Sequence, residues 1–147
     1  MSNYQFFASN KELREYKNSK WDFLKFFVRY IIRKKDYEEE ESSIRICKEN
    51  DLSTASFYTE KSYCAYVEWG FSEKNADIIM EYIKSHLKES KEIELWNVWE
   101  GERAEADVTE CFDNQLTIQH IKEIWGKDHF EKPEGLRIKN ANISEVK

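Results

Sequence analysis

The chain has 147 residues, of which 40% are hydrophobic and 15% aromatic, and its formal net charge is −6. This length predicts one domain with a core large enough to hold without metals or disulfides, and the hydrophobic content excludes a disordered chain. The sequence contains no run of 18 uncharged apolar residues and no N-terminal secretory pattern, so we expect a cytoplasmic protein.

The N-terminal part of the chain predicts a strand, a helix, a loop and a second strand. Residues 4–8 are aromatic-rich, which favours a first strand, and Ser9 after them can cap a helical turn. Residues 21–32 are mostly apolar with polar side chains every three or four positions, which is typical of a helix packed on two sides or covered by a partner. The acidic residues 36–43 predict a solvated internal loop, and residues 44–47 a short strand.

The next segment predicts a β-hairpin. Residues 55–59 and 62–70 are predicted as two strands joined by a tight turn at Glu60-Lys61. Both faces of the second strand are at least partly apolar, so we expect it to lie inside its sheet. One of these faces carries Tyr63, Ala65, Val67 and Trp69.

A helix and a second hairpin are predicted to follow. Ser72 precedes a regular apolar stripe and therefore caps the clearest helix of the sequence. Residues 92–99 follow as a strand, Glu100 and Gly101 supply a turn, and residues 104–112 are predicted to return as the hairpin partner. The helical stripe consists of Ala76, Ile79, Met80, Ile83 and Leu87.

The C-terminal third predicts one more helix and one more strand. Thr117 can cap the helix, and the turn at Pro133-Glu134-Gly135 precedes a last edge strand over residues 136–138. Residues 139–147 have little apolar content and are predicted to form a disordered tail. The pattern as a whole predicts a single α+β domain over residues 1–138, in which an antiparallel or mixed sheet of about five to six strands is packed with about two to four helices.

No familiar catalytic, nucleotide-binding or metal-binding motif is present in the sequence. The four glycines fall in no phosphate-loop or dinucleotide spacing, and His86, His120 and His129 stand in no HExxH pattern. The three cysteines are an odd number without a CxxC pair, so we expect reduced thiols. We therefore predict no cofactor and no bound metal.

Two arrangements of possible catalytic residues remain as alternatives. Cys111 ends a predicted strand and His120 lies in the following helix, so one interpretation is a nucleophile with its base. Glu105 and Asp107 share one face of a predicted strand and have the spacing of an acid pair. With 29 acidic residues in the chain such pairs arise by coincidence, and a solvated strand face is the simpler interpretation.

Three tryptophans lie on predicted strands, namely Trp69, Trp96 and Trp99. An indole on an open sheet face provides a large contact area at low entropic cost, which is typical of a binding surface. In the alternative interpretation, helices cover both faces of the sheet and all three indoles belong to the core. The choice depends on where the helix over residues 21–32 packs.

The charge distribution favours a protein-binding function. Residues 1–35 hold nine Lys and Arg against three Asp and Glu, a net charge of +6, which leaves −12 for the remainder. An acidic body of this kind suits a basic protein partner and repels nucleic acid. Because the polar stripe of residues 21–33 is narrow for a membrane-surface helix, we predict binding neither to nucleic acid nor to membranes.

Residues 62–99, together with the opening YQFFASNKEL segment over residues 4–13, resemble small uncharacterised proteins of Gram-positive bacteria. The resemblance covers residues 4–136 and implies no activity, because that family carries no motif tied to a chemistry. In its size, acidity and lack of a catalytic motif, the chain is also similar to bacterial immunity proteins and antitoxins, which act by capping a toxin.

These observations lead to three hypotheses. The first is a non-enzymatic cytoplasmic protein that binds a basic protein partner in the manner of an immunity protein or antitoxin, through the second predicted hairpin. The second is a small enzyme built around Cys111 and His120. The third is a homodimer paired through the helix over residues 21–32. The hairpin residues predicted to contact the partner are Trp96, Trp99, Glu100, Glu102, Glu105 and Asp107.

Overall fold

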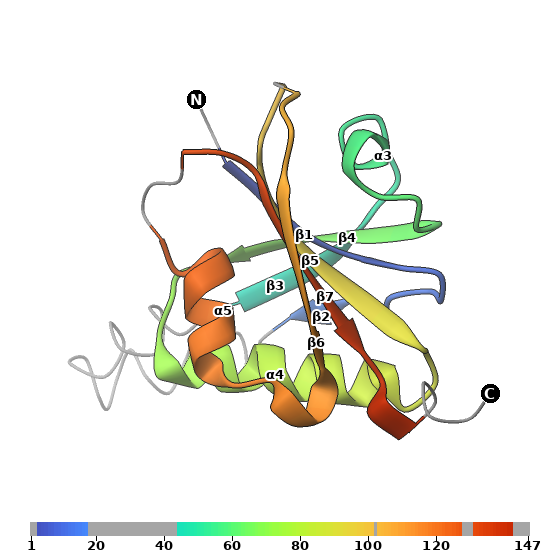
Figure 1. Cartoon of the computed structure of the whole chain (residues 1–147), viewed down its shortest axis with the longest axis vertical. Coiled ribbons are helices and arrows are strands. Elements are labelled where there is room, and N and C mark those ends of the chain that lie inside the picture. The colour runs from blue at the N-terminus through green and yellow to red at the C-terminus, as the bar shows by residue number, and fades with distance from the viewer. Residues whose placement is uncertain (1–2, 18–43, 102, 128–130, 143–147) are drawn as a thin grey trace, which may run out of the picture.

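A computed structural model describes residues 3–17, 44–101, 103–127 and 131–142 of the chain. Within these ranges the protein is a mixed sheet of seven strands with three α-helices (Figure 1). The predicted α+β class is therefore confirmed, and the sheet has more strands than the sequence predicted. The helix predicted over residues 21–32 lies outside the described residues, as does the acidic loop predicted over residues 36–43.

The strands are β1 (Asn3–Ser9), β2 (Tyr16–Lys17), β3 (Ile44–Glu49), β4 (Tyr63–Trp69), β5 (Glu92–Trp99), β6 (Asp107–Phe112) and β7 (Glu134–Lys139). The helices are α3 (Ala55–Tyr58), α4 (Glu73–Leu87) and α5 (Ile118–Trp125), with a 3-10 turn over Asp113–Gln115. The strand order is β2-β3-β4-β1-β5-β7-β6, so β4 lies inside the sheet as predicted. Neighbouring strands are antiparallel except β6 and β7, which run parallel.

The predicted hairpin between β5 and β6 is wrong in its pairing. Strand β7 pairs antiparallel with β5 and parallel with β6, so it separates the two strands that follow each other in sequence. Residues 136–138 therefore belong to an internal strand, and β6 lies at the edge in their place. Glu134 and Gly135, assigned to a turn from the sequence, are the first residues of β7. The turn after β5 is present, with Gly101 at a φ of 79°.

The hairpin predicted around Glu60-Lys61 is also wrong, because residues 55–58 form helix α3 where a strand was predicted. The helix has only four residues. A single turn is too short for a helical periodicity to be distinguished from the alternation of a strand, so the sequence gives no local signal for it.

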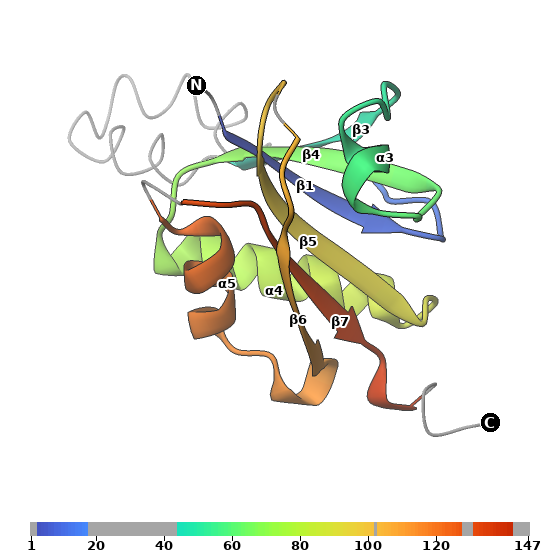
Figure 2. The ribbon, with the colours of Figure 1, turned by 45° about the horizontal axis from the view of Figure 1, so that its top comes forward.

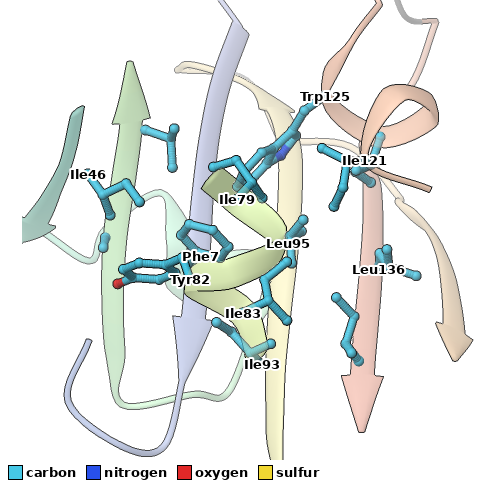
Figure 3. Close-up of a cluster of buried hydrophobic side chains, with 14 of the residues drawn as sticks. Phe7, Ile46, Ile79, Tyr82, Ile83, Ile93, Leu95, Ile121, Trp125 and Leu136 are labelled. Atoms are coloured by element: carbon cyan, nitrogen blue, oxygen red, sulfur yellow. The ribbon is translucent and has the colours of Figure 1, made fainter. Parts of the chain in front are cut away.

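Helices α4 and α5 cover one face of the sheet, which we call the α4 face (Figure 2). Ile79 and Ile83 of α4 belong to the same buried cluster as Phe7 and Leu95 of the sheet (Figure 3). The ring of Phe7 meets the indole of Trp125 edge-on, with centroids 4.9 Å apart. Because burial of each such side chain contributes about 1.5–3 kcal/mol, this cluster is the main source of stability of the fold.

The two longer helices begin where the sequence predicts. Ser72 caps α4, and its Oγ accepts a hydrogen bond from the backbone N–H of Asn75 at 3.1 Å. Thr117 is the N-cap of α5. The predicted apolar stripe of α4 lies in or against the core of the α4 face. Local capping and periodicity were sufficient to place these helices.

The opposite face of the sheet, which we call the α3 face, carries a second and smaller core beneath α3. Figure 2 shows α3 on the side of the sheet away from α4 and α5. Ala55 of α3 belongs to this second core. Both faces of the sheet are therefore covered, at least near the middle. The strand residues of this core are Phe6, Ala8, Cys64, Trp96 and Val98.

Residues 139–142, which the sequence assigns to a disordered tail, take part in the fold. Lys139 is the last residue of β7. The backbone N–H of Asn140 donates to the carbonyl of Lys91 at 2.8 Å, and its side-chain amide donates to the carbonyl of Leu87. Asn140 is buried. These bonds fasten the end of β7 to the turn that follows α4.

Candidate functional site

The residues predicted to contact a partner fall into two groups in the structure. Trp96 is only 1% exposed, and Trp99 is half-buried. The expected coupling of surface acids to surface indoles is therefore absent at Trp96. Glu100, Glu105 and Asp107 are exposed, and Glu102 lies outside the described residues.

Trp96 is held in the core of the α3 face by contacts on several sides. Its ring centroid lies 6.3 Å from that of Phe6 and 5.7 Å from that of Tyr58. A Cβ atom placed on Gly135 would be 2.7 Å from a carbon of the indole, so the ring lies directly against the backbone of β7. The indole Nε1–H donates to the carboxylate of Glu94 at 3.0 Å. The interpretation of the tryptophans as core residues is thus right for Trp96, and its predicted role in partner contact is wrong.

Glu94 is a buried carboxylate that holds an arginine in place. Its Oε1 accepts hydrogen bonds from Thr59 Oγ1 at 2.5 Å and from the indole of Trp96, and its Oε2 accepts from Arg137 Nε at 3.0 Å. The Glu94 side chain is 3% exposed and that of Arg137 is 38% exposed. Since a buried carboxylate needs such partners to offset its desolvation, this arrangement fixes the plane of the guanidinium.

A polar pocket of about 800 Å³ opens on the α3 face beside Glu94. Strands β5, β6 and β7 form one side of it, and α3 with the residues after it forms the other. Two further ion pairs line the pocket, Lys61 with Glu92 at 2.5 Å and Lys139 with Glu110 at 3.3 Å. The charged lining residues are Glu60, Lys61, Glu92, Glu94, Glu110, Arg137 and Lys139.

Strand β6 is an edge of the sheet formed by the described residues. On the α3 face it exposes Val108 by 39% and Phe112 by 40%, with Glu110 between them. Residues 105–113 carry four acidic side chains and no Lys or Arg. We call this surface, made of strand β6 with Glu105 and Asp113 at its ends, the β6 edge. It combines apolar side chains with a local excess of negative charge.

Three of the four acids of the β6 edge, Glu105, Asp107 and Glu110, are exposed, and Asp113 is half-buried. Asp107 pairs with Lys132 at 3.0 Å, and the side chains of this pair are 64% and 49% exposed respectively. Asp107 also raises the pKa of the Lys132 ammonium by accepting a hydrogen bond from it. Exposed pairs of this kind are weak, so they exchange readily for the charges of a partner. Glu105 and Asp107 are therefore surface acids, which is the simpler of the two interpretations of their spacing.

Cys111 and His120 are not brought together as a catalytic pair. Cys111 packs against the core of the α4 face, and its burial together with the nearby Asp113 carboxylate raises the pKa of its thiol, which disfavours the nucleophilic thiolate. The Nδ1 atom of His120 accepts a hydrogen bond from the backbone N–H of Thr117 at 3.0 Å, so this ring caps α5. Among the described residues no hydrogen bond joins Cys111 to His120.

A buried serine–histidine contact joins β1 to α4, and sequence reasoning missed it. Ser9 Oγ lies 2.7 Å from His86 Nε2, although the two residues are 77 positions apart. Burial and the charges of Arg14 and Lys11 lower the pKa of His86, which favours the neutral ring. Because Ser9 is completely buried, no substrate reaches its hydroxyl, and the contact is structural.

Two other side chains with nucleophilic groups, those of Cys64 and Tyr4, are buried and half-buried on the α3 face. Burial and the carboxylates of Glu94 and Glu49 raise the pKa of the Cys64 thiol to about 11. The hydroxyl of Tyr4 donates to Glu49 at 2.6 Å, and burial together with this bond raises the pKa of the hydroxyl. Both groups therefore remain protonated near neutral pH.

The described residues contain no group of three or more His, Cys, Asp or Glu side chains placed to hold a metal ion. None of the helices in the described ranges is long and apolar enough to span a membrane. Comparisons of the chain with protein-family models, with curated proteins and with solved structures find no match. Fold and site together define an α+β protein with an exposed edge strand and a polar pocket beside it.

Proposed function

We propose that this protein is a non-enzymatic binding protein that takes an extended, basic segment of a partner protein along the β6 edge. The observation that carries the proposal is an edge strand that exposes both Val108 and Phe112 within an acidic stretch. A partner strand added to such an edge gains main-chain hydrogen bonds, and the side chains that alternate along it provide specificity.

The alternation of side chains along β6 specifies what the partner segment must offer. Val108, Glu110 and Phe112 lie on the α3 face, and the residues between them point to the α4 face. On the α3 face, an added strand therefore places apolar side chains beside Val108 and Phe112 and a Lys or Arg beside Glu110. On the α4 face it places a second basic side chain beside Asp107. The segment that fits is one in which basic and apolar residues are interspersed.

The same charges argue against a second copy of the chain as the occupant. Two β6 edges paired with each other would bring the four acids of residues 105–113 against the same four acids of the second copy. Like charges on adjacent strands are destabilising. A basic protein is attracted by the negative potential of these acids, which also accelerates its association.

This mode of action fits an immunity protein or antitoxin of the cytoplasm, which neutralises a basic toxin by covering part of its surface. The net charge of −6 supports such a role. The described residues also bring together no catalytic pair at Cys111 and His120. The proposal keeps the predicted acidic contacts at Glu105 and Asp107. In place of the predicted tryptophans, Trp96 and Trp99, it uses Val108 and Phe112.

The proposal is tested with a synthetic peptide that contains the segment Lys-Val-Thr-Lys-Thr-Val, titrated calorimetrically into the protein. As a strand, this segment places valine, lysine and valine in turn on one face and a further lysine on the other. The test variant is Glu105→Lys/Asp107→Lys on the β6 edge. The matched control is Asp77→Lys/Glu81→Lys on the exposed side of α4, which changes the net charge by the same amount. We expect the wild type and the control to bind and the β6 variant to bind about tenfold more weakly or worse.

Two outcomes of this titration contradict the proposal. One is equal weakening of peptide binding in both variants, which would mean that the peptide is attracted by the net charge of the protein alone. The other is undiminished binding by the β6 variant. The same peptide with glutamate in place of each lysine is expected not to bind, and raising the ionic strength from about 50 to about 300 mM is expected to weaken binding of the lysine peptide.

The native partner is sought by affinity purification from the host at low salt with the same three proteins. The account predicts a basic protein that the wild type and the α4 variant recover and the β6 variant does not. Recovery of no protein, or of a protein that all three retain equally, contradicts a role as a partner-capping protein.

A further inference from the structure

We propose that the polar pocket of the α3 face binds a small zwitterionic amino-carboxylate, a free amino acid with an apolar side chain. The carboxylate of the ligand lies on the guanidinium of Arg137 and its ammonium lies on the carboxylate of Glu110. This site goes beyond the proposed capture of a protein segment. Glu110 belongs to both surfaces, but the pocket extends from β6 over the α3 face to the residues after α3, whereas the partner segment lies along the outer side of β6.

The first argument is that Arg137 is held ready for an anion. Its Nε donates to the buried carboxylate of Glu94, which Thr59 and Trp96 hold from the other side. The guanidinium plane is thus fixed while the side chain stays 38% exposed to the pocket. No described residue accepts a hydrogen bond from its Nη nitrogens. A fixed guanidinium with unused donors is the group best suited to bind a carboxylate.

The second argument is the spacing of Arg137 and Glu110. Arg137 Nη1 lies 3.9 Å from Glu110 Oε2, which is beyond hydrogen-bond distance. A ligand whose carboxylate and ammonium sit on one carbon atom fits across this gap, because each of its charges then meets the opposite charge of the protein. The ligand then makes two charge-assisted contacts, its carboxylate with the guanidinium of Arg137 and its ammonium with the carboxylate of Glu110.

The third argument is the charge balance of the pocket. Four acids and three bases line it, and they come from the segment after α3 and from β5, β6 and β7. A simple anion would meet four carboxylates, and a simple cation would meet three positive groups. Lys61 and Glu92 are paired at 2.5 Å and largely shielded, so they satisfy each other. Lys139 also pairs with Glu110, at 3.3 Å, but both side chains are more than one third exposed, so this weaker pair can yield to the ammonium of a ligand. A ligand that carries both charges then has an opposite charge for each of its own at Arg137 and Glu110.

The fourth argument concerns the size and the wall of the pocket. A volume of about 800 Å³ lies within the range of small-molecule sites. Phe57 and Tyr58 of α3 line the side opposite the strands, and Phe57 is 48% exposed. These rings offer an apolar contact for the side chain of the ligand. They are the reason for assigning an apolar amino acid to the site.

The experiment follows backbone amide resonances by NMR during titration with L-phenylalanine, L-leucine and L-valine. Phenethylamine and 3-phenylpropionate are the matched probes that lack one charge each. We expect saturable shifts around Arg137 and Glu110 for at least one amino acid, with the phenylalanine analogues binding about tenfold more weakly than phenylalanine. Absence of saturable shifts for all three amino acids overturns the proposal, and so does equal binding of 3-phenylpropionate, which would indicate a plain anion site.

Variants distinguish the pocket from the rest of the surface. Glu110→Gln is expected to weaken amino-acid binding about tenfold. Glu134→Gln is the matched control, because this carboxylate pairs with Lys127 on the α4 face, and it is expected to bind as the wild type. Equal effects of the two variants overturn the assignment. The Glu105→Lys/Asp107→Lys variant is expected to bind amino acids as the wild type does. The proposal for the pocket and the proposal for the β6 edge are therefore tested independently.

Discussion

Gly135→Ala is expected to destabilise the protein although it adds only one methyl group. The added Cβ would lie 2.7, 2.8 and 2.9 Å from three carbons of the Trp96 ring, closer than atoms in proteins approach. The ring cannot move away easily, because it is 1% exposed and its Nε1–H is bonded to Glu94. Overpacking of a filled core costs about 1–3 kcal/mol, and we expect a loss in that range.

The assay is urea denaturation of the variants followed by far-ultraviolet circular dichroism. Gly70→Ala is the matched control, since a Cβ there meets nothing within 4 Å, and it is expected to change stability by less than about 1 kcal/mol. In a Trp96→Leu background, Gly135→Ala should lose most of its effect, with a coupling energy of about 1 kcal/mol or more. If Gly135→Ala is as stable as Gly70→Ala, or shows no coupling to Trp96, then β7 does not lie beside β5 as described.

Three further predictions concern titratable groups. Cys64, with a pKa raised to about 11, should react with a disulfide reagent at pH 8 far more slowly in the folded protein than in urea, and fast native labelling seen by mass spectrometry would contradict its burial. Because the pKa of His86 is lowered in the folded protein, the unfolded chain binds a proton more readily than the folded one, and stability should fall as the pH drops below 6.5. Unfolding measured as a function of pH should show a smaller fall for His86→Gln. Arg137→Met leaves the buried Glu94 without its cation and should lower the free energy of unfolding, measured by urea denaturation, by about 2 kcal/mol. Lys139→Met should lower it clearly less, because the partner of Lys139 is exposed, and equal losses would refute the expectation.

Local patterns were sufficient for much of the fold. Ser72 and Thr117 mark the starts of α4 and α5, since N-caps act within one turn of the chain. The strand over residues 92–99 was predicted with its observed bounds, because a run of apolar and β-branched residues between turns is a strong signal. These predictions depend only on neighbours in sequence.

The position of β7 could not be predicted, because long-range contacts decide it. The sequence favours pairing of successive strands, yet the glycine at 135 makes room for Trp96, and Glu94 forms its ion pair with Arg137, 43 residues away. Neither contact has a local signature. The parallel pairing of β6 with β7 follows from this insertion.

The surface could be predicted only in part. The exposed acids at Glu105 and Asp107 follow from composition, since charged side chains are rarely buried. The burial of Trp96 was one of two interpretations that the sequence left open, because both faces of β5 carry apolar side chains and alternation alone does not say which face carries a helix. The pocket could not be predicted either, since its walls come from α3 and from strands that β7 brings together.

Hydrogen exchange of the β6 backbone tests the central claim most directly. The amides of residues 107–112 are followed by NMR with and without a saturating concentration of the peptide that contains Lys-Val-Thr-Lys-Thr-Val. The account predicts that amides on the outer side of β6, which exchange fast in the free protein, become protected by the added strand, while those of α4 are unchanged. Exchange along β6 that stays as fast with the peptide as without it would contradict the account.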